Sequence, residues 1–76
     1  MAVAFVFLNT EIGAERAVFN ALKKVSGVKE AHLVYGTYDI VARISANMMD
    51  ELRQIVIHRI RRIDKVFNPL TAMAVE

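Results

Sequence analysis

The sequence predicts an α+β fold whose elements follow in the order strand, helix, strand, strand, helix, strand. The first observation is internal repetition: when the chain is aligned with itself so that Val18 matches Val56, LKKVSGV (22–28) falls on IRRIDKV (60–66). The second is apolar spacing, which has a helical period in two segments and the pattern of strands in four others. Each half of the chain is therefore expected to form one strand, helix, strand unit.

Each predicted element follows from its local pattern, and the six ranges are 2–8, 13–25, 28–35, 38–45, 47–62 and 66–75. The two helices are predicted from apolar stripes with members three or four residues apart: Ala14, Val18, Ala21, Leu22 and Val25, then Leu52, Ile55, Val56, Ile60 and Ile63. Gly13 or Thr10 is expected to open the first helix. Asn47 followed by Asp50 resembles a capping box on the second.

Right-handed connections give this element order one simple topology. It is the ferredoxin-like βαββαβ arrangement, a four-stranded antiparallel sheet in the order 4-1-3-2 with both helices on one face. The nearly continuous apolar run of 2–8 suits a central strand, and Pro69 falls in an edge strand, where a missing N–H donor is tolerated. No linker-like stretch divides the chain, so 1–76 is expected to be a single domain.

Composition excludes several classes of protein. There is no cysteine, which removes disulfides and thiol nucleophiles and agrees with a cytoplasmic location. The chain is 55% hydrophobic, yet no apolar run approaches the ~20 residues of a membrane span, and no signal peptide is recognisable. The net charge of +2 does not by itself indicate nucleic acid binding.

The segment VYGTYDIV (34–41) sets the register of the second and third strands. A two-residue turn at Gly36 and Thr37 would place Tyr35 opposite Tyr38. One sheet face, the helix-covered core, then receives Ala31, Leu33, Ile40, Ala42 and Ile44. The other face receives the pairs Glu30 with Arg43, His32 with Val41, and Val34 with Asp39.

The second sheet face also receives alternate residues of the apolar first strand. It combines Phe or Val side chains of 2–8 with Val34, Val41 and a single cross-strand ion pair. Such a face is too apolar to remain in water. We therefore expect a homodimer that forms through the sheets.

Asp39 is unusual because it lies at the start of an apolar strand. A half-buried carboxylate is costly unless it is paired or hydrogen-bonded. One interpretation is that it binds N–H groups of its own hairpin and orders the turn. The other is that it contacts a ligand, and both roles are compatible.

These residues resemble a known family. Over essentially its whole length the chain is similar to the C-terminal regulatory domain of the Lrp/AsnC transcription regulators of bacteria and archaea, also called the RAM domain. The resemblance depends on Gly27-Val28, then Gly36-x-Tyr38-Asp39, then an apolar strand. Two departures are Ser26, where Pro is usual, and Pro69, where a polar residue is common; the second could alter an effector pocket.

The resemblance implies a function. Such domains dimerise through their sheets, assemble into dimers of dimers or rings, and bind amino acids or related small molecules between dimers. By resemblance, the ligand-binding residues are Tyr35, Gly36, Thr37, Tyr38, Asp39 and Thr71. Such a site needs no metal and no cofactor, because a glycine turn and a carboxylate suit the two charges of a zwitterion.

The family also carries a helix-turn-helix, whereas the first predicted strand begins at Ala2. We therefore expect a stand-alone effector domain that does not bind DNA directly and could join full-length Lrp/AsnC-type regulators. Its expected function is non-catalytic: amino-acid binding and oligomerisation, linked to transcription regulation of amino-acid metabolism.

Two other classes remain open. A small dimeric α+β barrel enzyme would have to use His32, Asp39 or Arg43, with no serine or cysteine partner on their sheet face. An RNA-binding module would need stacking aromatics, for which only Phe5 or Phe7 is available. His32 and His58 are isolated histidines, so no metal site is expected.

Overall fold

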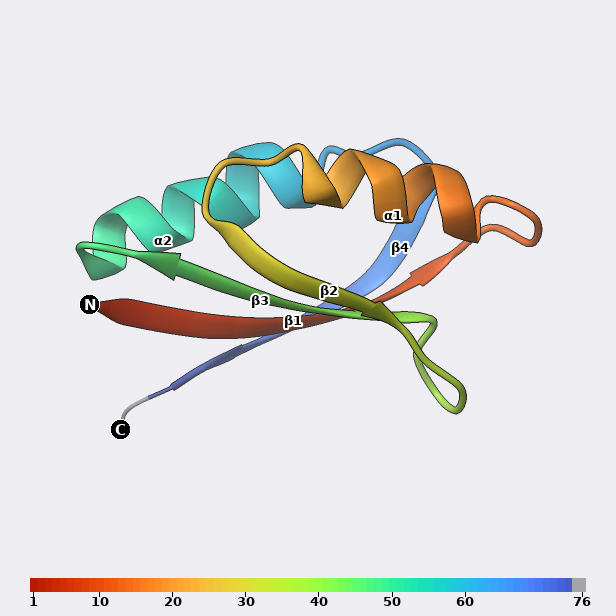
Figure 1. The fold of residues 1–76 in the computed structure, drawn as a ribbon, viewed down its shortest axis with the longest axis horizontal. Helices are drawn as coiled ribbons and strands as arrows, with labels where there is room; N and C mark the ends of the chain where they lie inside the picture. Colours follow the sequence, from red (N-terminus) through yellow and green to blue (C-terminus); the bar gives the residue numbers. More distant parts are fainter. Residues whose placement is uncertain (75–76) are drawn as a thin grey trace.

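The structure, a computed structural model, describes residues 1–74. Its elements are β1 (Ala2–Thr10), α1 (Glu15–Lys23), β2 (Val28–Leu33), β3 (Ile40–Ala46), α2 (Met49–Ile55), the π-helical segment η1 (Val56–Ile60) and β4 (Val66–Met73). The strands form one antiparallel sheet in the order β2-β3-β1-β4, with both helices on the same face (Figure 1). The ferredoxin-like prediction is confirmed; the predicted end of the last strand, residue 75, lies outside the described residues.

The core lies between the sheet and the helices. Alternate residues of the two central strands are buried beneath the helices: Ala4, Val6 and Leu8 from β1, and Ile40, Ala42 and Ile44 from β3. The helices contribute Val18 and Leu22 from α1, and Leu52, Val56 and Ile60 from α2 and η1. Both predicted apolar stripes are therefore confirmed, with Ile55 and Ile63 partly buried at their margin.

The helix starts differ from the sequence prediction. The N-caps are Ala14 for α1 and Met48 for α2, and neither makes a side-chain capping hydrogen bond. A capping box pairs the N-cap with the third helical residue. Since α2 begins at Met49, Asn47 precedes the cap and Asp50 is only the second helical residue, so the box prediction is wrong.

The second helix ends in a wider turn. The N–H of Arg61 donates to the C=O of Val56, five residues earlier, at 3.0 Å, which is the bonding pattern of a π-helix. Val56 and Ile60 are both buried against the sheet in this segment, while Ile57 between them is 48% exposed.

A β-bulge interrupts the edge strand β4. The pairing with β1 shifts between Phe7 and Asn9, so Asn68 and Pro69 together lie opposite Leu8. Asn68 has a φ of 53°, and asparagine tolerates this left-handed conformation better than most residues. The missing N–H of Pro69 thus falls at an interruption of an edge ladder, as predicted for an edge strand.

Candidate functional site

The β2 and β3 strands pair in the predicted register, with Glu30 opposite Arg43 and His32 opposite Val41. Beyond the strands, the N–H of Val34 donates to the C=O of Asp39 at 2.9 Å. We refer to residues 34–39 as the 34–39 loop.

The expected two-residue turn is wrong, because within residues 1–74 no backbone hydrogen bond joins Tyr35 to Tyr38. The ring of Tyr38 instead packs on Phe7 of β1, with centroids 5.7 Å apart and planes inclined at 52°. Tyr35 is fully exposed. The contact with β1 therefore replaces the expected cross-strand tyrosine pair.

Asp39 connects the 34–39 loop to the end of β1. Its Oδ2 accepts hydrogen bonds from the backbone N–H of Thr10 at 3.0 Å and from the side-chain amide of Asn9 at 3.3 Å. The Asn9 amide also donates to the C=O of Thr37 at 2.9 Å. The carboxylate therefore accepts hydrogen bonds from donors of β1. The prediction that it binds N–H groups of its own hairpin is wrong.

A groove opens beside this loop. β1 and β2 run in the same direction, so the segment after β1 and the 34–39 loop lie at the same end of the sheet (Figure 1). Between the loop and the start of α1 lies an open groove of about 600 Å³, here called the α1 groove. It is lined by Gly13, Glu15, Arg16, Leu33, Val34, Tyr35 and Asp39.

One groove residue corrects the sequence prediction. Alternation along the strand predicts Leu33 in the core, but its side chain is 42% exposed. Leu33 is the last paired residue of the edge strand β2 and lies opposite the buried Ile40. The α1 groove opens beside it, so no other described element covers its side chain. An apolar side chain predicted to be in the core is therefore available to a ligand.

The charges of the α1 groove come mainly from the first turn of α1. The Arg16 guanidinium lies over the ring of Phe19, 5.3 Å from its centroid. In the part of the chain that the structure describes, no carboxylate forms an ion pair with Arg16. Glu15 accepts a hydrogen bond from the N–H of Gly13 at 3.4 Å. The groove thus combines one free guanidinium with two carboxylates, those of Glu15 and Asp39.

The other predicted site residues are distributed unevenly. Gly36 has a φ of 122° in the exposed part of the loop, a conformation that favours glycine. Tyr38 lies on the sheet face opposite the helices, against Phe7. Thr71 is in β4, opposite Val6 and separated from the loop by β1. Of the six predicted site residues, Tyr35 and Asp39 line the groove, and four do not: Gly36, Thr37, Tyr38 and Thr71.

Sequence reasoning missed Gly13, Glu15 and Arg16 as site residues. A usable signal existed, because strands that run in the same direction end at the same edge of a sheet. The topology alone could have placed the segment after β1 beside the 34–39 loop. Only the structure shows that α1 begins close enough to form the other wall.

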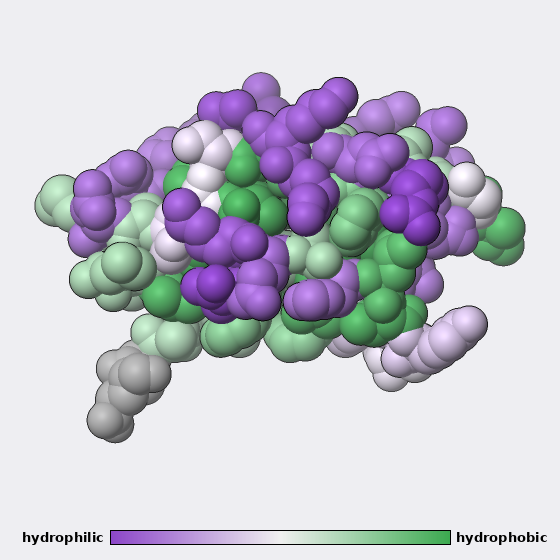
Figure 2. All heavy atoms as spheres, viewed as in Figure 1, coloured by the Kyte–Doolittle hydropathy of each residue, from purple (hydrophilic) through white to green (hydrophobic). Residues whose placement is uncertain are grey.

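The sheet face opposite the helices, here called the open face, is rich in apolar side chains. Following the register, it carries Phe5, Phe7, Val41, Phe67 and Leu70. Phe5, Phe67 and Leu70 are substantially exposed. In Figure 2, hydrophilic residues gather over the helical layer, whereas hydrophobic residues reach the surface along the lower edge, where the sheet lies.

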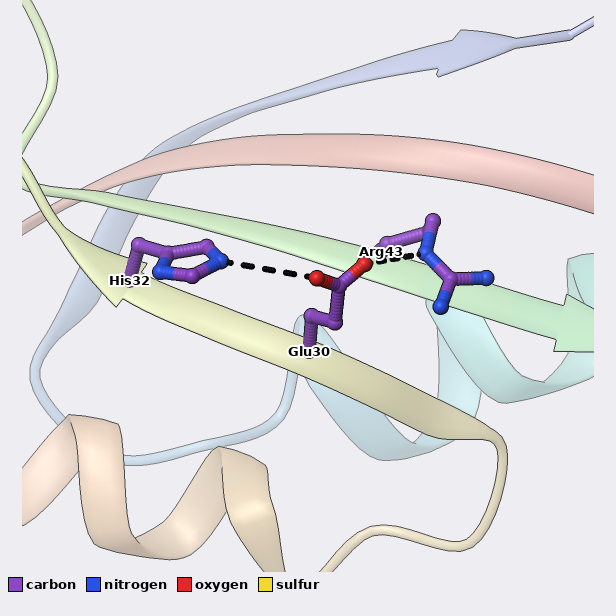
Figure 3. Close-up of polar contacts among 3 residues, drawn as sticks. All are labelled: Glu30, His32 and Arg43. Atoms are coloured by element: carbon purple, nitrogen blue, oxygen red, sulfur yellow. Dashed lines mark hydrogen bonds and ion pairs between the residues drawn. The ribbon is translucent and has the colours of Figure 1, made fainter.

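A polar cluster lies at the β2 side of the open face. Arg43 Nε donates to Glu30 Oε2 at 2.6 Å, and His32 Nε2 lies 3.8 Å from Glu30 Oε1. Figure 3 shows Glu30 between these two partners. The hydrogen bond and positive charge of Arg43 hold the pKa of the Glu30 carboxyl below its ordinary value.

We also searched the described residues for groups of metal-ligating side chains and for membrane-spanning helices. Among residues 1–74, no three His, Asp or Glu side chains come together as a metal site. The described helices also include none that is long and apolar enough to cross a membrane.

Comparisons with known proteins agree on one family. Residues 3–76 match the family model described as the Lrp/AsnC ligand binding domain. A curated relative, an uncharacterised HTH-type transcriptional regulator of Pyrococcus horikoshii, is 32% identical over 60 residues. That match covers 79% of this chain but only 40% of the relative, so the chain spans well under half the length of the regulator.

Solved structures agree in fold. The crystal structure of FFRP-DM1 is 32% identical, with a TM-score of 0.93 and coverage of 99% of this chain and 100% of that one. A transcriptional regulator of Neisseria meningitidis, solved as a complex with L-Met, has a TM-score of 0.84. The latter is 14% identical, and the match covers 99% of this chain and 50% of that one, so it bears on the fold alone.

Proposed function

The chain belongs to the Lrp/AsnC ligand-binding domain family, and from this premise we propose that it is a non-catalytic module that binds an amino acid and forms oligomers. Its role is linked to transcription regulation of amino-acid metabolism. The observation that carries the proposal is the α1 groove, which opens directly beside Asp39. Its volume lies within the ~300–1,000 Å³ that is usual for small-molecule sites.

The 34–39 loop forms one wall of the proposed site. Within residues 1–74, Asp39 is held by Thr10 and Asn9 through Oδ2 and makes no hydrogen bond through Oδ1, so the second oxygen is available to a ligand ammonium group. Tyr35, Gly36 and Thr37 belong to the same exposed segment. Neither Tyr38 nor Thr71 lines the groove in its own chain. We keep Tyr38 as a candidate for a contribution from a second copy, whereas the Oγ1 of Thr71 is buried within its own chain.

Oligomerisation is proposed from the open face. Phe5, Phe67 and Leu70 expose apolar surface there, and packing two such faces would remove it from water. Stable interfaces bury roughly 1,200–2,000 Å², an area within reach of two four-stranded faces. We propose a homodimer through the sheets, with dimers meeting at the groove end to form dimers of dimers or rings.

DNA contact is proposed to come from elsewhere. In residues 1–74 both helices pack on the sheet as part of one core. A DNA-binding part would therefore come from a further segment or from a full-length Lrp/AsnC-type regulator in a mixed assembly. Native mass spectrometry of this chain mixed with such a regulator tests this, and mixed oligomers are the expected result.

No described contact favours the enzyme or RNA alternatives. Arg43 is paired with Glu30, and Asp39 is bonded to the end of β1. These groups have structural partners that account for them.

A thermal-shift screen of the twenty amino acids tests the central proposal, because a ligand that binds only the folded state raises the melting temperature. We expect stabilisation by at least one amino acid at millimolar concentration. Asp39→Ala should lose that response while it still assembles. Failure of every amino acid to stabilise the wild-type chain would remove ligand sensing from the proposal.

A further inference from the structure

We infer that the α1 groove takes an α-amino acid with an uncharged aliphatic side chain, that Arg16 binds its carboxylate, and that Phe19 positions Arg16. This inference rests on the proposed function and adds the class of ligand. It also assigns two residues of α1 that the family motif in the 34–39 loop does not include.

The carboxylate site follows from the free charge of Arg16. Its guanidinium lines the groove, and no Asp or Glu within residues 1–74 forms an ion pair with it. A guanidinium offers a planar fork of donors that matches a carboxylate with two parallel hydrogen bonds. Arg16 is the only cationic side chain among the groove residues of the described chain, so it is the natural anchor for the ligand carboxylate.

Phe19 restricts where that guanidinium lies. Arg16 is three residues before Phe19, so both occupy one face of α1, and the guanidinium lies 5.3 Å from the ring centroid. Lys23, four residues after Phe19, contacts the same ring at 5.7 Å but does not line the groove. The ring therefore holds Arg16 at the groove. Lys23 contacts the same ring without lining the groove, so it is a matched control cation with no role in ligand binding.

The ammonium site lies across the groove. Asp39 uses Oδ2 for the contacts with β1 and leaves Oδ1 without a hydrogen bond in the described residues. Glu15 adds a second carboxylate at the edge of the groove. The groove therefore offers one cation and two anions. An α-amino acid matches this arrangement because an ammonium group and a carboxylate are both bonded to its α-carbon.

The other residues that line the α1 groove determine which ligand side chain it favours. Once Glu15, Arg16 and Asp39 hold the head group, the other side chains that line the groove are those of Leu33, Val34 and Tyr35. Apolar walls favour an apolar side chain, since its burial removes apolar area from water. A charged ligand side chain of either sign would lie against these apolar walls without a partner, which disfavours both acidic and basic amino acids.

A single chain leaves this site open to solvent. Ile12 and Tyr35, which flank it on the two neighbouring loops, are both fully exposed. A second copy of the chain that covers the groove would bury both side chains. The ligand is therefore enclosed between copies, which agrees with the proposed contact between dimers.

Calorimetric titration of the full chain with matched ligands tests the role of Arg16. Arg16→Gln should weaken L-leucine about 10-fold or more, the loss expected for a charge-assisted bond. L-leucinamide lacks the carboxylate and should bind the wild-type chain and R16Q equally. Lys24→Gln, which removes a cation at the other end of α1, should leave L-leucine affinity unchanged.

Phe19 variants test the positioning role. Phe19→Leu should weaken L-leucine by roughly 2- to 5-fold, the size of an exposed cation–π contact, and leave L-leucinamide unaffected. Phe19→Tyr keeps the ring and should restore wild-type affinity. Lys23→Gln removes the other cation on this ring and should change neither ligand. A general loss of packing would instead weaken both ligands alike.

The outcomes separate the inference from the proposed function. If no amino acid binds, the proposed function and this inference both fail. If L-leucine binds R16Q as tightly as it binds the wild-type chain, only the role of Arg16 and Phe19 is overturned. If L-glutamate or L-lysine binds more tightly than L-leucine and L-valine, the aliphatic class is overturned.

Discussion

The carboxylate of Asp39 accepts a hydrogen bond from the backbone N–H of Thr10 at 3.0 Å. This bond joins the loop between β2 and β3 to the end of β1, across 29 residues of sequence. It explains how an acid is tolerated at the start of an apolar strand. It also places the carboxylate at the edge of the α1 groove.

Asp39→Ala should lower the free energy of unfolding by about 1–3 kcal/mol, because it leaves the N–H of Thr10 and the amide of Asn9 without their shared acceptor. Urea titration followed by circular dichroism measures the change. Asp64→Asn is the control, since Asp64 is exposed and forms no ion pair within residues 1–74. Equal loss in both variants would contradict a specific role for the Asp39 contacts.

The Glu30 and Arg43 pair should make stability depend on pH. The pKa of Glu30 is lowered in the folded state, so its contribution is present above the unfolded-state pKa, near 4.5. It is lost as the pH falls through the folded-state pKa. Glu30→Gln should therefore be less stable than wild type at pH 7 and no less stable once the pH lies well below the lowered pKa of Glu30.

The measurement is urea unfolding of both proteins at several pH values and at low and high salt. The pair is exposed, so high salt should reduce the difference at pH 7. Glu11→Gln, a change at an exposed residue without a described ion pair, controls for general charge effects. A deficit of Glu30→Gln that persists unchanged at low pH would argue against the linkage.

Gly27→Ala should be clearly destabilising. A Cβ at this position would lie 2.8 Å from Ile55 Cδ1 and 3.3 Å from the C=O oxygen of Ser45, and the residue has a φ of 100°. Overpacking of about 1–3 kcal/mol adds to a backbone strain of about 1–2 kcal/mol, so the total cost should be about 2–5 kcal/mol. Gly13→Ala is the matched control because its φ is 86° but an added Cβ would meet no atom within 4 Å.

Thermal unfolding of the two glycine variants measures the difference. Gly13→Ala should show only the strain of a left-handed alanine, about 1–2 kcal/mol. If Gly27→Ala is no less stable than Gly13→Ala, the close packing of the turn before β2 against α2 does not constrain the fold.

The open face should control dimer formation. Leu70 is 49% exposed on this face, opposite Phe7, and Leu70→Lys would place a charge in the proposed interface. We expect wild type to sediment as a dimer or larger species at micromolar concentration and Leu70→Lys to shift toward monomer. Ile57→Lys, an equally exposed position at 48% on the helical side, should keep the wild-type assembly.

Thr71 offers a test that separates packing from ligand binding. Its Oγ1 is buried and has no hydrogen-bond partner in residues 1–74. Thr71→Val removes this unsatisfied group without a change of shape, so stability should stay equal or rise by up to about 1 kcal/mol. Thr10 also has a buried Oγ1 without a hydrogen-bond partner in residues 1–74, so Thr10→Val should have the same effect on stability.

A loss of amino-acid response in Thr71→Val but not in Thr10→Val would assign the Thr71 hydroxyl to the ligand. Unchanged responses in both variants would leave Thr71 a packing residue. Thermal shift with and without the stabilising amino acid distinguishes the two results.

Local sequence patterns were sufficient for the strand order and the core. The period of Leu52, Val56 and Ile60 predicts one buried helix face, and all three are buried. Counting outward from a hairpin centred on Gly36 and Thr37 predicts Glu30 opposite Arg43, which the sheet confirms. These features depend on residues that are close in sequence or on pairing from a hairpin, where regular geometry determines the neighbours.

The ferredoxin-like topology, the core stripes and the cross-strand register can thus all be predicted from the amino-acid pattern. Three features needed the folded chain: Asp39 binds the end of β1, Leu33 is exposed, and Arg16 faces the 34–39 loop. Each of these depends on how α1 and β1 meet a loop about twenty to thirty residues away in the chain. No local periodicity reports such contacts, because they are set by the packing of separate elements.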